Sequence, residues 1–418
     1  MEAKSIESIS EIMRYDGLGY SSVGTISQTL TTIGGVLPNV QSIEIDKKMY
    51  ITAVADEIFI GKQPILITLE PISSVILSIE LAKDRTEESW EEHLSKIDEK
   101  MEITSMVTDE GKGLRSATNK RGIAWQPDTY HAIAHRLGKW VSKLEARAYK
   151  RIEIEYERKR VIKSAKTQKV INQRRYKYSK AKKKTLEAIE LYENFIYLYL
   201  HIIKELQPFH SNGKLRDKKQ AKENMKIALE LMTTLKNEPI NKEIEKIERI
   251  LPKLLNYFNE AKKVIRRCKE LGFNDESITN LTLAWQWNKA LIKAKKKERI
   301  KRAKAEYLFY MTYAKDTLQD KFEDVRKAIF RELDHIIQAS SMVENINSIL
   351  RPYLNNAKNQ ISQKFLNLFM FYHNHRRYKD GKRKGKTPME ILTGKKQDKK
   401  WVELLADFIE KSDADFFL

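Results

Sequence analysis

The spacing of apolar residues changes twice along this chain of 418 residues. Between positions 49 and 109 the apolar residues fall into short runs rich in Ile, Val and Leu, namely MYITAVADEIFI, PILITLEP and SSVILSIELA. Turn signals, GKQP at 61–64 and PIS at 71–73, separate these runs. Short apolar runs bounded by turn residues predict three successive strands joined by hairpins.

The next segments alternate between the two periods. TEESWEEHLSKI (86–97) has its acidic residues in the first turn, which is typical of a helix, and ITSMVT (103–108) reads as a fourth strand. RGIAWQPDTYHAIAHRL (121–137) predicts a short strand that leads into a helix. This order of elements indicates an α/β fold with a largely buried sheet.

From about 131 to 340 the apolar residues keep helical spacing, for example in LEAIELYENFIYLYLHIIKEL and IEKIERILPKLLNYF. We expect joints at 212–214, 237–239 and 272–274, where Gly, Asn or Pro interrupts the pattern. Residues 341–394 predict helices in VENINSILR and ISQKFLNLFMFYHNHRRY, a basic loop GKRKGK, and a short helix in TPMEILTG that begins at Pro and ends before Gly.

The two ends of the chain each predict short helices. Residues 1–40 contain two helical segments separated by the glycine-rich turn YDGLGY, so they indicate either a partial helix-turn-helix or a plain helical linker. Both interpretations stay open. Residues 395–418 predict a last helix, WVELLADFIEK, and an acidic and aromatic tail.

Composition narrows the class of partner. The formal net charge is +21, which favours polyanionic partners through long-range attraction and counterion release. Cys268 is the single cysteine, so an internal disulfide framework is excluded and a reducing cytosol is expected. The polar N-terminus and the lack of a long apolar run predict neither a signal peptide nor a membrane span.

Three carboxylates form the candidate chemistry. Asp56 and Asp109 each stand at the end of a predicted strand, where sites form in open α/β sheets, and Glu344 stands on a predicted helix. Carboxylates are the ligands that hard cations such as Mg²⁺ prefer, and a pair of such ions can drive in-line cleavage of a phosphodiester. Each acid alone is typical of a turn or cap residue, so the hypothesis depends on all three meeting.

The segments ADEIF with Asp56, VTDEGKGL with Asp109 and SSMVENINSILRPYL with Glu344 resemble the DDE transposases of prokaryotic insertion sequences. The resemblance extends over roughly 43–137 and 341–394, and its most specific part is FMFYHNHRRYKDGKRKGKTPMEILTG, with Tyr-x-Asn-x-Arg, a basic loop and a proline-started helix. More than half of the chain separates Asp109 from Glu344. The hAT-type enzymes, which have an all-helical insertion, resemble this layout.

The resemblance implies a fold class and a division of the chain. The expected fold is an α/β RNase H-like core, a mixed sheet with flanking helices, interrupted by a large all-α insertion, so that the whole is mostly α. The expected parts are 1–40, the partial helix-turn-helix or linker; 41–130 and 341–394, the two parts of the core; 131–340, the insertion; and 395–418, the C-terminal helix and tail.

The resemblance also implies an activity. Asp56, Asp109 and Glu344 would be the catalytic residues and metal ligands, holding two Mg²⁺ ions or Mn²⁺ as a substitute. The enzyme would cleave at transposon ends and transfer the 3′-OH into target DNA. Its partners would be transposon-end and target DNA and further copies of itself, in a homodimer or higher oligomer on DNA, with no membrane, in the cytoplasm at the nucleoid.

Several other residues are candidates for DNA contact. Asn347 and Arg351 follow Glu344 by three and seven positions and share its helix face, so they are expected to reach phosphates. Basic residues beyond them are further candidates for phosphate contact: Arg376, Arg377, Lys382, Arg383 and Lys384.

Two tryptophans in the helical stretch, Trp285 and Trp287, are candidates for stacking on a flipped base, as in related insertions. Their spacing puts them on different helix faces, so core packing is the expected role for at least one. Asp128 and His131 resemble a Cys/Asp-x-x-His pair that follows the second acid in such enzymes and are candidates for support of the site. Packing at a helix start is the favoured role for His131.

Alternatives of other classes remain open. The carboxylates also permit an RNase H-like nuclease or resolvase without strand transfer, although the C-terminal block disfavours it. A catalytically inactive DNA-binding relative and a helical scaffold with incidental acids are further interpretations.

Overall fold

A computed structural model of the protein describes all residues except 1–3, 19–21, 44–46, 98, 358–360 and 417–418. The chain divides into two compact units. The first consists of Met1–Asp128 together with Ile337–Leu418, and the second of Thr129–Ile336. The insertion was expected at 131–340, so its expected ends lie within four residues of the ends of the second unit.

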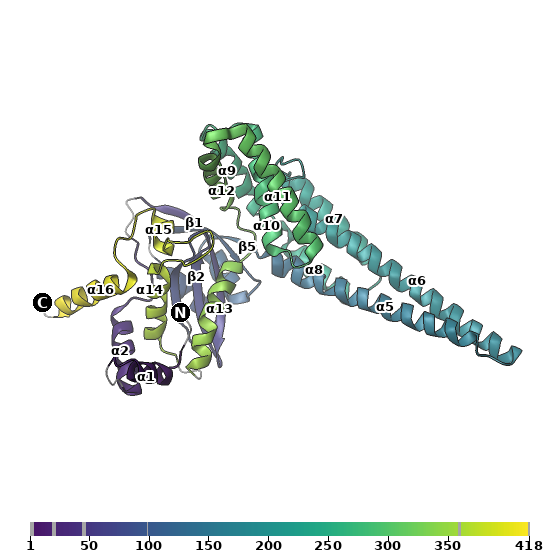
Figure 1. The fold of residues 1–418 in the computed structure, drawn as a ribbon, viewed down its shortest axis with the longest axis horizontal. Coiled ribbons are helices and arrows are strands. Elements are labelled where there is room, and N and C mark those ends of the chain that lie inside the picture. Colours follow the sequence, from purple (N-terminus) through teal and green to yellow (C-terminus); the bar gives the residue numbers. More distant parts are fainter. Residues whose placement is uncertain (1–3, 19–21, 44–46, 98, 358–360, 417–418) are drawn as a thin grey trace. The chain divides into compact units, whose positions relative to one another are not determined.

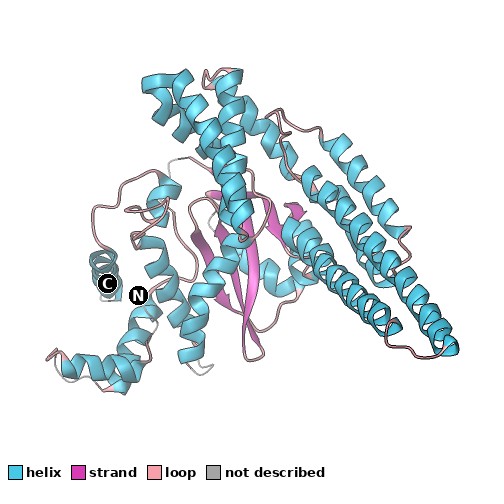
Figure 2. Ribbon diagram, turned by 45° about the vertical axis from the view of Figure 1, so that its right-hand side comes forward, coloured by secondary structure: helices cyan, strands magenta, loops and turns pink. Residues whose placement is uncertain are grey.

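The first unit contains a five-stranded mixed sheet, drawn in magenta in Figure 2. Its strands are β1 (Met49–Ile60), β2 (Gln63–Glu70), β3 (Val75–Leu81), β4 (Met101–Thr108) and β5 (Ala124–Pro127), in the order β3-β2-β1-β4-β5. β1, β2 and β3 pair antiparallel, whereas β1, β4 and β5 run parallel. The strands predicted from the apolar runs are therefore confirmed.

Each face of the sheet is covered by a pair of helices. On one face α13 (Ser341–Asn356) and α14 (Gln363–His375) pack on Val54, Ile58 and Val107. On the other face α3 (Glu87–Ser95) and α4 (Lys112–Lys120) pack on Ala53, Ala55 and Met106. Because side chains alternate along a strand, even-numbered β1 residues and odd-numbered β4 residues point toward α13.

Side chains of α14 protect the outer edge of the sheet. The Asn374 Nδ2 donates to the Ile76 carbonyl and its Oδ1 accepts from the Ile76 amide, both at 2.9 Å. Gln363 likewise accepts from the Leu81 amide at 2.7 Å and donates to the Ile79 carbonyl at 2.9 Å. The unpaired backbone groups of an edge strand would otherwise invite another strand. Asn374, the central residue of the Tyr-x-Asn-x-Arg motif, therefore has a structural role.

The remaining helices of this unit agree with the predicted pattern. They are α1 (Ile6–Tyr15), α2 (Val23–Val36), α15 (Pro388–Thr393) and α16 (Trp401–Phe416). α2 lies so close to α14 that a Cβ on Gly34 would come within 2.0 Å of the Lys364 carbonyl oxygen. The two N-terminal helices are present as expected, and a DNA-binding role for them stays a prediction.

The second unit is all-helical (Figure 1). Its elements are the π-helical turn η1 (Tyr130–His135), α5 (Arg136–Ile162), α6 (Gln168–Glu205), α7 (Lys218–Thr233), α8 (Glu238–Leu254), α9 (Tyr257–Glu270), α10 (Asp275–Lys293), α11 (Lys297–Leu318), the 3₁₀ turn η2 (Gln319–Lys321) and α12 (Phe322–Leu333). The predicted joints at 212–214 and 272–274 fall between helices, and the joint at 237–239 includes the last residue before α8 and its first two residues.

The chain leaves and re-enters the first unit at one place. The Gln126 Nε2 donates to the Ile337 carbonyl at 3.0 Å. The Ser340 amide and hydroxyl both donate to Asp128 Oδ2, at 2.7 Å and 2.6 Å. Asp128 and Ser340 are both buried. The ends of the second unit are therefore fixed next to each other, which keeps the entropic cost of the long excursion small.

We expect Asp128→Ala to lower the free energy of unfolding by about 1–3 kcal/mol, because it leaves the buried Ser340 amide without its acceptor. Urea-induced unfolding of the whole chain measures the change. Asp128→Asn keeps an acceptor oxygen and should lose less. Asp398→Ala, at an exposed acid 3.9 Å from Lys396, is the control and should change stability by less than about 0.5 kcal/mol. Equal effects of Asp128→Ala and Asp398→Ala would contradict the role of this contact.

Candidate functional site

Two aspartates come from the ends of adjacent parallel strands. Val54 of β1 is paired with Val107 of β4, and Asp56 and Asp109 each follow two residues later. The alternation of side chains directs both carboxylates to the face covered by α13. The carboxyl ends of neighbouring parallel strands are where ligand sites form in α/β sheets.

Glu344 reaches the same region from α13. Val343, Ile346 and Leu350 are buried against the sheet, while Glu344, in the first turn of the helix, is exposed. Its carboxylate acts on Asp56, because burial and then the charges of Asp109, Glu57 and Glu344 together raise the pKa of Asp56 to about 7. Glu344 thus acts on Asp56 through its charge, and one metal site formed by the three acids stays a prediction.

Asn347, one turn after Glu344, has a partner that the sequence did not predict. Its Nδ2 donates to Asp56 Oδ2 at 3.0 Å, and the residue is buried. Its Oδ1 is also buried and accepts no hydrogen bond from the residues that the structure describes. The expected contact of Asn347 with a DNA phosphate is replaced here by orientation of Asp56. Arg351, one turn farther, is exposed as a phosphate contact requires.

An arginine that sequence reasoning missed lies beside the acids. Arg85 Nη1 donates to Glu57 Oε1 at 2.5 Å, and the pKa of Arg85 is raised by this bond and also by the charge of Asp109. Glu57 follows Asp56 on β1 and so points to the opposite face of the sheet. In the sequence, Arg85 stands in the Lys-Asp-Arg stretch after β3. Its distance along the chain from Asp109 follows no pattern that would have predicted that the two lie close together.

A pocket of about 830 Å³ opens between α3 and α4, on the face of the sheet to which Glu57 points. Glu57, Arg85, Lys112 and Arg115 are among its lining residues. Its shape depends on Gly113, because a Cβ there would lie 2.2 Å from the Arg85 carbonyl oxygen. Three cationic side chains therefore face one hollow at the end of β4.

The donor set fits a hard divalent cation in its chemistry. Three carboxylates and the unpartnered Asn347 Oδ1 offer oxygen ligands. The raised pKa of Asp56 comes first from burial and then from the neighbouring acids, and a bound cation would oppose both effects. Asp109 Oδ1 accepts from the Gly111 amide at 2.9 Å, which holds that carboxylate at the strand end. Among the described residues, however, no three His, Cys, Asp or Glu side chains are close enough to enclose an ion. A metal site would require the three carboxylates to draw closer together.

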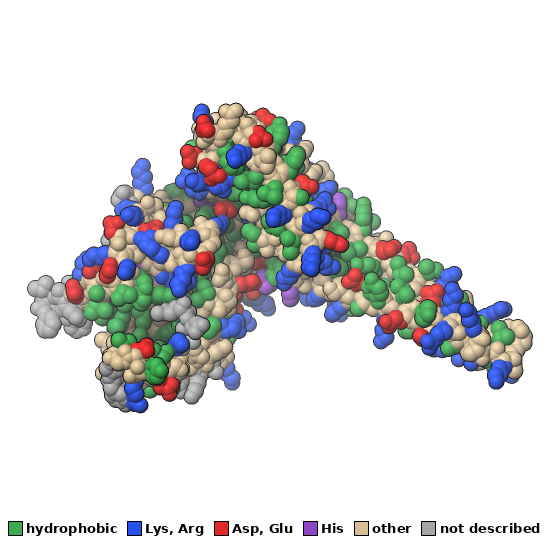
Figure 3. Space-filling model, in the orientation of Figure 1, with side chains coloured by type: hydrophobic (Ala, Val, Ile, Leu, Met, Phe, Trp, Pro, Cys, Tyr) green, Lys and Arg blue, Asp and Glu red, His purple; other side chains and the backbone are tan. Residues whose placement is uncertain are grey.

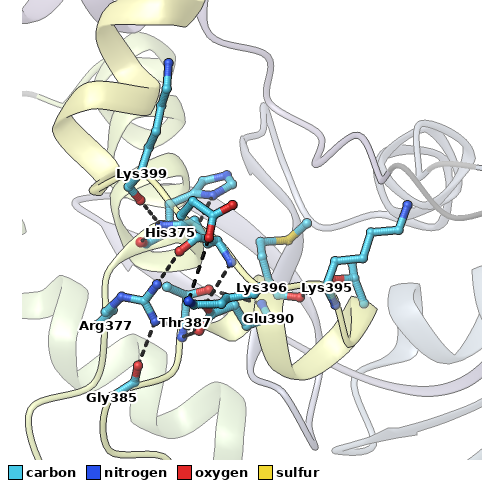
Figure 4. A network of polar contacts seen from close by, with 12 residues as sticks. His375, Arg377, Gly385, Thr387, Glu390, Lys395, Lys396 and Lys399 are labelled. Atoms are coloured by element: carbon cyan, nitrogen blue, oxygen red, sulfur yellow. Dashed lines mark hydrogen bonds and ion pairs between the residues drawn. The ribbon is translucent and has the colours of Figure 1, made fainter.

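The basic residues after α14 divide into two groups. Arg377 donates to the Gly385 carbonyl at 2.7 Å and to Glu390 at 2.8 Å (Figure 4). Arg383 donates to the Pro71 and Ile72 carbonyls at 3.2 Å and 2.6 Å. These guanidinium groups hold loops together, and the expected DNA contacts of Arg377 and Arg383 stay predictions.

The other three basic residues of this block differ. Arg376 is half-buried, with its guanidinium 5.3 Å from the centre of the Tyr372 ring. Lys382 and Lys384 are exposed, as phosphate contacts require.

The two tryptophans also differ from each other. Trp285 is 3% exposed, its Nε1 donates to Asp334 at 3.1 Å and its ring meets Phe209 edge-on. A buried indole cannot stack on a base, so the DNA-binding assignment of Trp285 is corrected to core packing, the role expected for at least one of the pair. Trp287 is half-buried, with Arg302 5.8 Å from the centre of its ring.

The two support candidates belong to different units. Asp128 anchors the start of α13 through Ser340, and thereby positions the helix of Glu344. His131 lies in the turn η1 of the second unit, where its ring is 5.4 Å from that of Tyr130 and 5.9 Å from that of His135. Packing at a helix start, the favoured role for His131, agrees with these contacts.

Comparison with models of protein families, with curated proteins and with solved structures found no match. In the described part of the chain, no helix combines the length and the apolar character that crossing a membrane requires.

We expect Asp56→Asn to stabilise the metal-free protein at pH 8 but not at pH 4. The folded pKa of Asp56 is about 7 and its unfolded value is about 3.9, so the stability gained from its proton is complete below pH 4 and is lost as the pH rises through 7. Thermal unfolding in EDTA should show the gap between variant and wild type widening by about 4 °C or more from pH 4 to pH 8.

The control for this measurement is Glu102→Gln, at an exposed acid of the same sheet that pairs with Lys48. Its difference from wild type should stay nearly constant over the same range. If the difference in melting temperature between Asp56→Asn and wild type is also independent of pH, the pKa of Asp56 is not raised in the folded protein.

Proposed function

We propose that this protein is a DDE-type transposase whose first unit is an RNase H-like core. The observation that carries the proposal is the placement of Asp56 and Asp109 at the ends of adjacent parallel strands, with Glu344 near enough to raise the pKa of Asp56. Placing several acidic side chains close together and partly burying them lowers the stability of a fold. Such arrangements are concentrated at functional sites.

The three carboxylates would hold the metal ions. Divalent ions, when bound, supply activation of the attacking oxygen and stabilisation of the leaving oxygen. Asp56 would be fixed by its bond from Asn347, and Asp109 by its bond from the Gly111 amide. Glu344, on the exposed side of α13, would complete the set when DNA approaches.

The cations around the site support a polyanionic substrate. Arg85, Lys112 and Arg115 line the pocket between α3 and α4, and Lys382 and Lys384 are exposed after α14. Arg85 is already paired with Glu57, so Lys112 and Arg115 are the candidates on that face to contact DNA phosphates away from the cleaved bond. The net charge of +21 favours the same class of partner.

Binding of Mg²⁺ or Mn²⁺ tests the metal assignment directly. Calorimetric titration should show divalent binding by wild type and by Glu102→Gln, with loss of at least about 10-fold in affinity for Asp109→Asn and Glu344→Gln, because each removes a charged ligand. Unchanged affinity in both site variants would remove these acids from the metal site.

Cleavage tests the activity. The substrate is a supercoiled plasmid carrying the genomic sequences that flank the gene, with Mg²⁺. We expect cuts at those sequences and joining of the 3′ ends to target DNA, both reduced at least about 100-fold by Glu344→Gln while DNA binding persists. Cuts without joining would favour a nuclease or resolvase, and binding without cuts would favour an inactive relative.

A further inference from the structure

α5 and α6 form a two-helix arm in which half the length has no buried residue. All of residues 149–184 are described and none of them is buried: the last buried residue of α5 is Ala148, and the first of α6 is Thr185. At 1.5 Å per residue, the α5 side of this arm is about 20 Å long. Figure 1 shows this end of the hairpin extending beyond the other helices of the same unit.

Hydrogen bonds join the two helices of the arm at its base and near its tip. Thr185 Oγ1 donates to the Arg151 carbonyl at 3.0 Å at its base, and Arg174 Nη1 donates to Ser164 Oγ at 2.9 Å near its tip. The apolar side chains of the tip, Val161, Ile162 and Val170, are half-buried. The arm therefore encloses no core of its own.

The outer part of the arm, residues 158–184, is entirely cationic. It contains thirteen basic residues and no acidic residue: Arg158, Lys159, Arg160, Lys163, Lys166, Lys169, Arg174, Arg175, Lys177, Lys180, Lys182, Lys183 and Lys184. All are exposed except Arg174, which is half-buried. Blue side chains gather over this end of the hairpin in Figure 3.

These charges are almost uncompensated. Arg160 pairs with Glu157 at 2.8 Å, and within the described residues no other ion pair involves the thirteen. Lys177, Lys180 and Lys184 repeat at three and four positions, so they lie on one helix face and repel one another. Such a surface is unfavourable to the isolated fold and becomes favourable when a polyanion covers it.

We propose that this arm binds the phosphate backbone of duplex DNA without reading its sequence. The proposal rests on the proposed function for the choice of DNA. Two α-helices side by side are about 20 Å wide, whereas the major groove is about 12 Å wide. The pair cannot enter the groove together, so its lysines contact the backbone.

The chemistry of the tip disfavours other polyanionic surfaces. An amphipathic helix that lies on a membrane buries a broad apolar face. Here the apolar residues Val161, Ile162 and Val170 of the tip are half-buried, and Tyr176 is the one exposed large hydrophobic side chain in 158–184. The observations therefore favour nucleic acid over a lipid surface.

The test compares two full-length variants with equal loss of charge. The arm variant replaces with Gln six exposed lysines: Lys163, Lys166, Lys169, Lys177, Lys180 and Lys184. The control variant replaces with Gln six exposed lysines of α7, α8 and α9 in the same unit: Lys219, Lys222, Lys226, Lys242, Lys262 and Lys263. A third variant replaces the six arm lysines with Arg, which keeps the charge.

Fluorescence anisotropy with a 40-base-pair duplex of arbitrary sequence measures affinity against salt concentration. We expect the arm variant to bind at least about 10-fold more weakly at 0.1 M salt. The slope of log K against log salt concentration should also be smaller in magnitude by up to about five, because each lost phosphate contact changes this slope by about 0.9. The control and Arg variants should keep the wild-type slope within about one. The loss should be equal on a duplex that carries the flanking sequences of the gene.

Each other outcome overturns the proposal. An arm variant with the slope of the control would mean that these lysines contact no phosphate. A loss confined to the flanking sequences would mean that the arm reads bases. Arm-dependent binding that is tighter to double-stranded RNA or to phosphatidylserine vesicles would replace DNA as the partner.

The two proposals fail separately. DNA binding that depends on the arm, without Mg²⁺-dependent cleavage, would retain the arm and reject the transposase. In the opposite case, the arm variant binds DNA and cleaves the flanking sequences with the affinity and rate of wild type. That result would support the transposase proposal and contradict the proposed DNA binding by the arm.

Discussion

The closure at Asp128 is the contact on which the rest of the first unit depends. One buried carboxylate accepts two hydrogen bonds from Ser340, so the chain returns from the helical unit at the place where it left. Half of the sequence lies between these two residues. Because its two ends are fixed next to each other, this long insertion adds little entropic cost to the first unit. α13 begins at the next residue, so the same contact sets the height at which Glu344 and Asn347 meet the sheet.

Electrostatic strain concentrates where α13 meets the strand ends. Burial and three neighbouring acids oppose ionisation of Asp56, and Asn347 offsets this with one hydrogen bond while its own Oδ1 stays unpartnered. The fold could lower its energy by replacing either side chain with an apolar one of similar size. Retention of both is consistent with a site that becomes satisfied by something the chain does not itself supply.

The sequence predicts this molecule best where local pattern decides structure. Alternating apolar runs located β1 to β4, and Gly, Asn and Pro located three joints of the helical unit. The turn between α5 and α6 was missed, because residues 163–167 contain neither Gly nor Pro and both flanking helices share its basic composition. Asn347 and Arg85 were missed as partners of the acids because their contacts depend on how α13 and α3 sit on the sheet, which no spacing records.

The basic residues show why charge alone assigns so little. Arg377 and Arg383 look like phosphate contacts in the sequence, yet their guanidinium groups bind carbonyl oxygens within the fold. Planar guanidinium groups suit such fixed bonds, whereas an ammonium group on a flexible stem makes mobile point contacts. Nine of the thirteen cations of the arm are lysines, and they have almost no partners in the folded chain. The arm therefore presents charge that folding leaves available, and this availability distinguishes it from the basic residues that the fold itself engages.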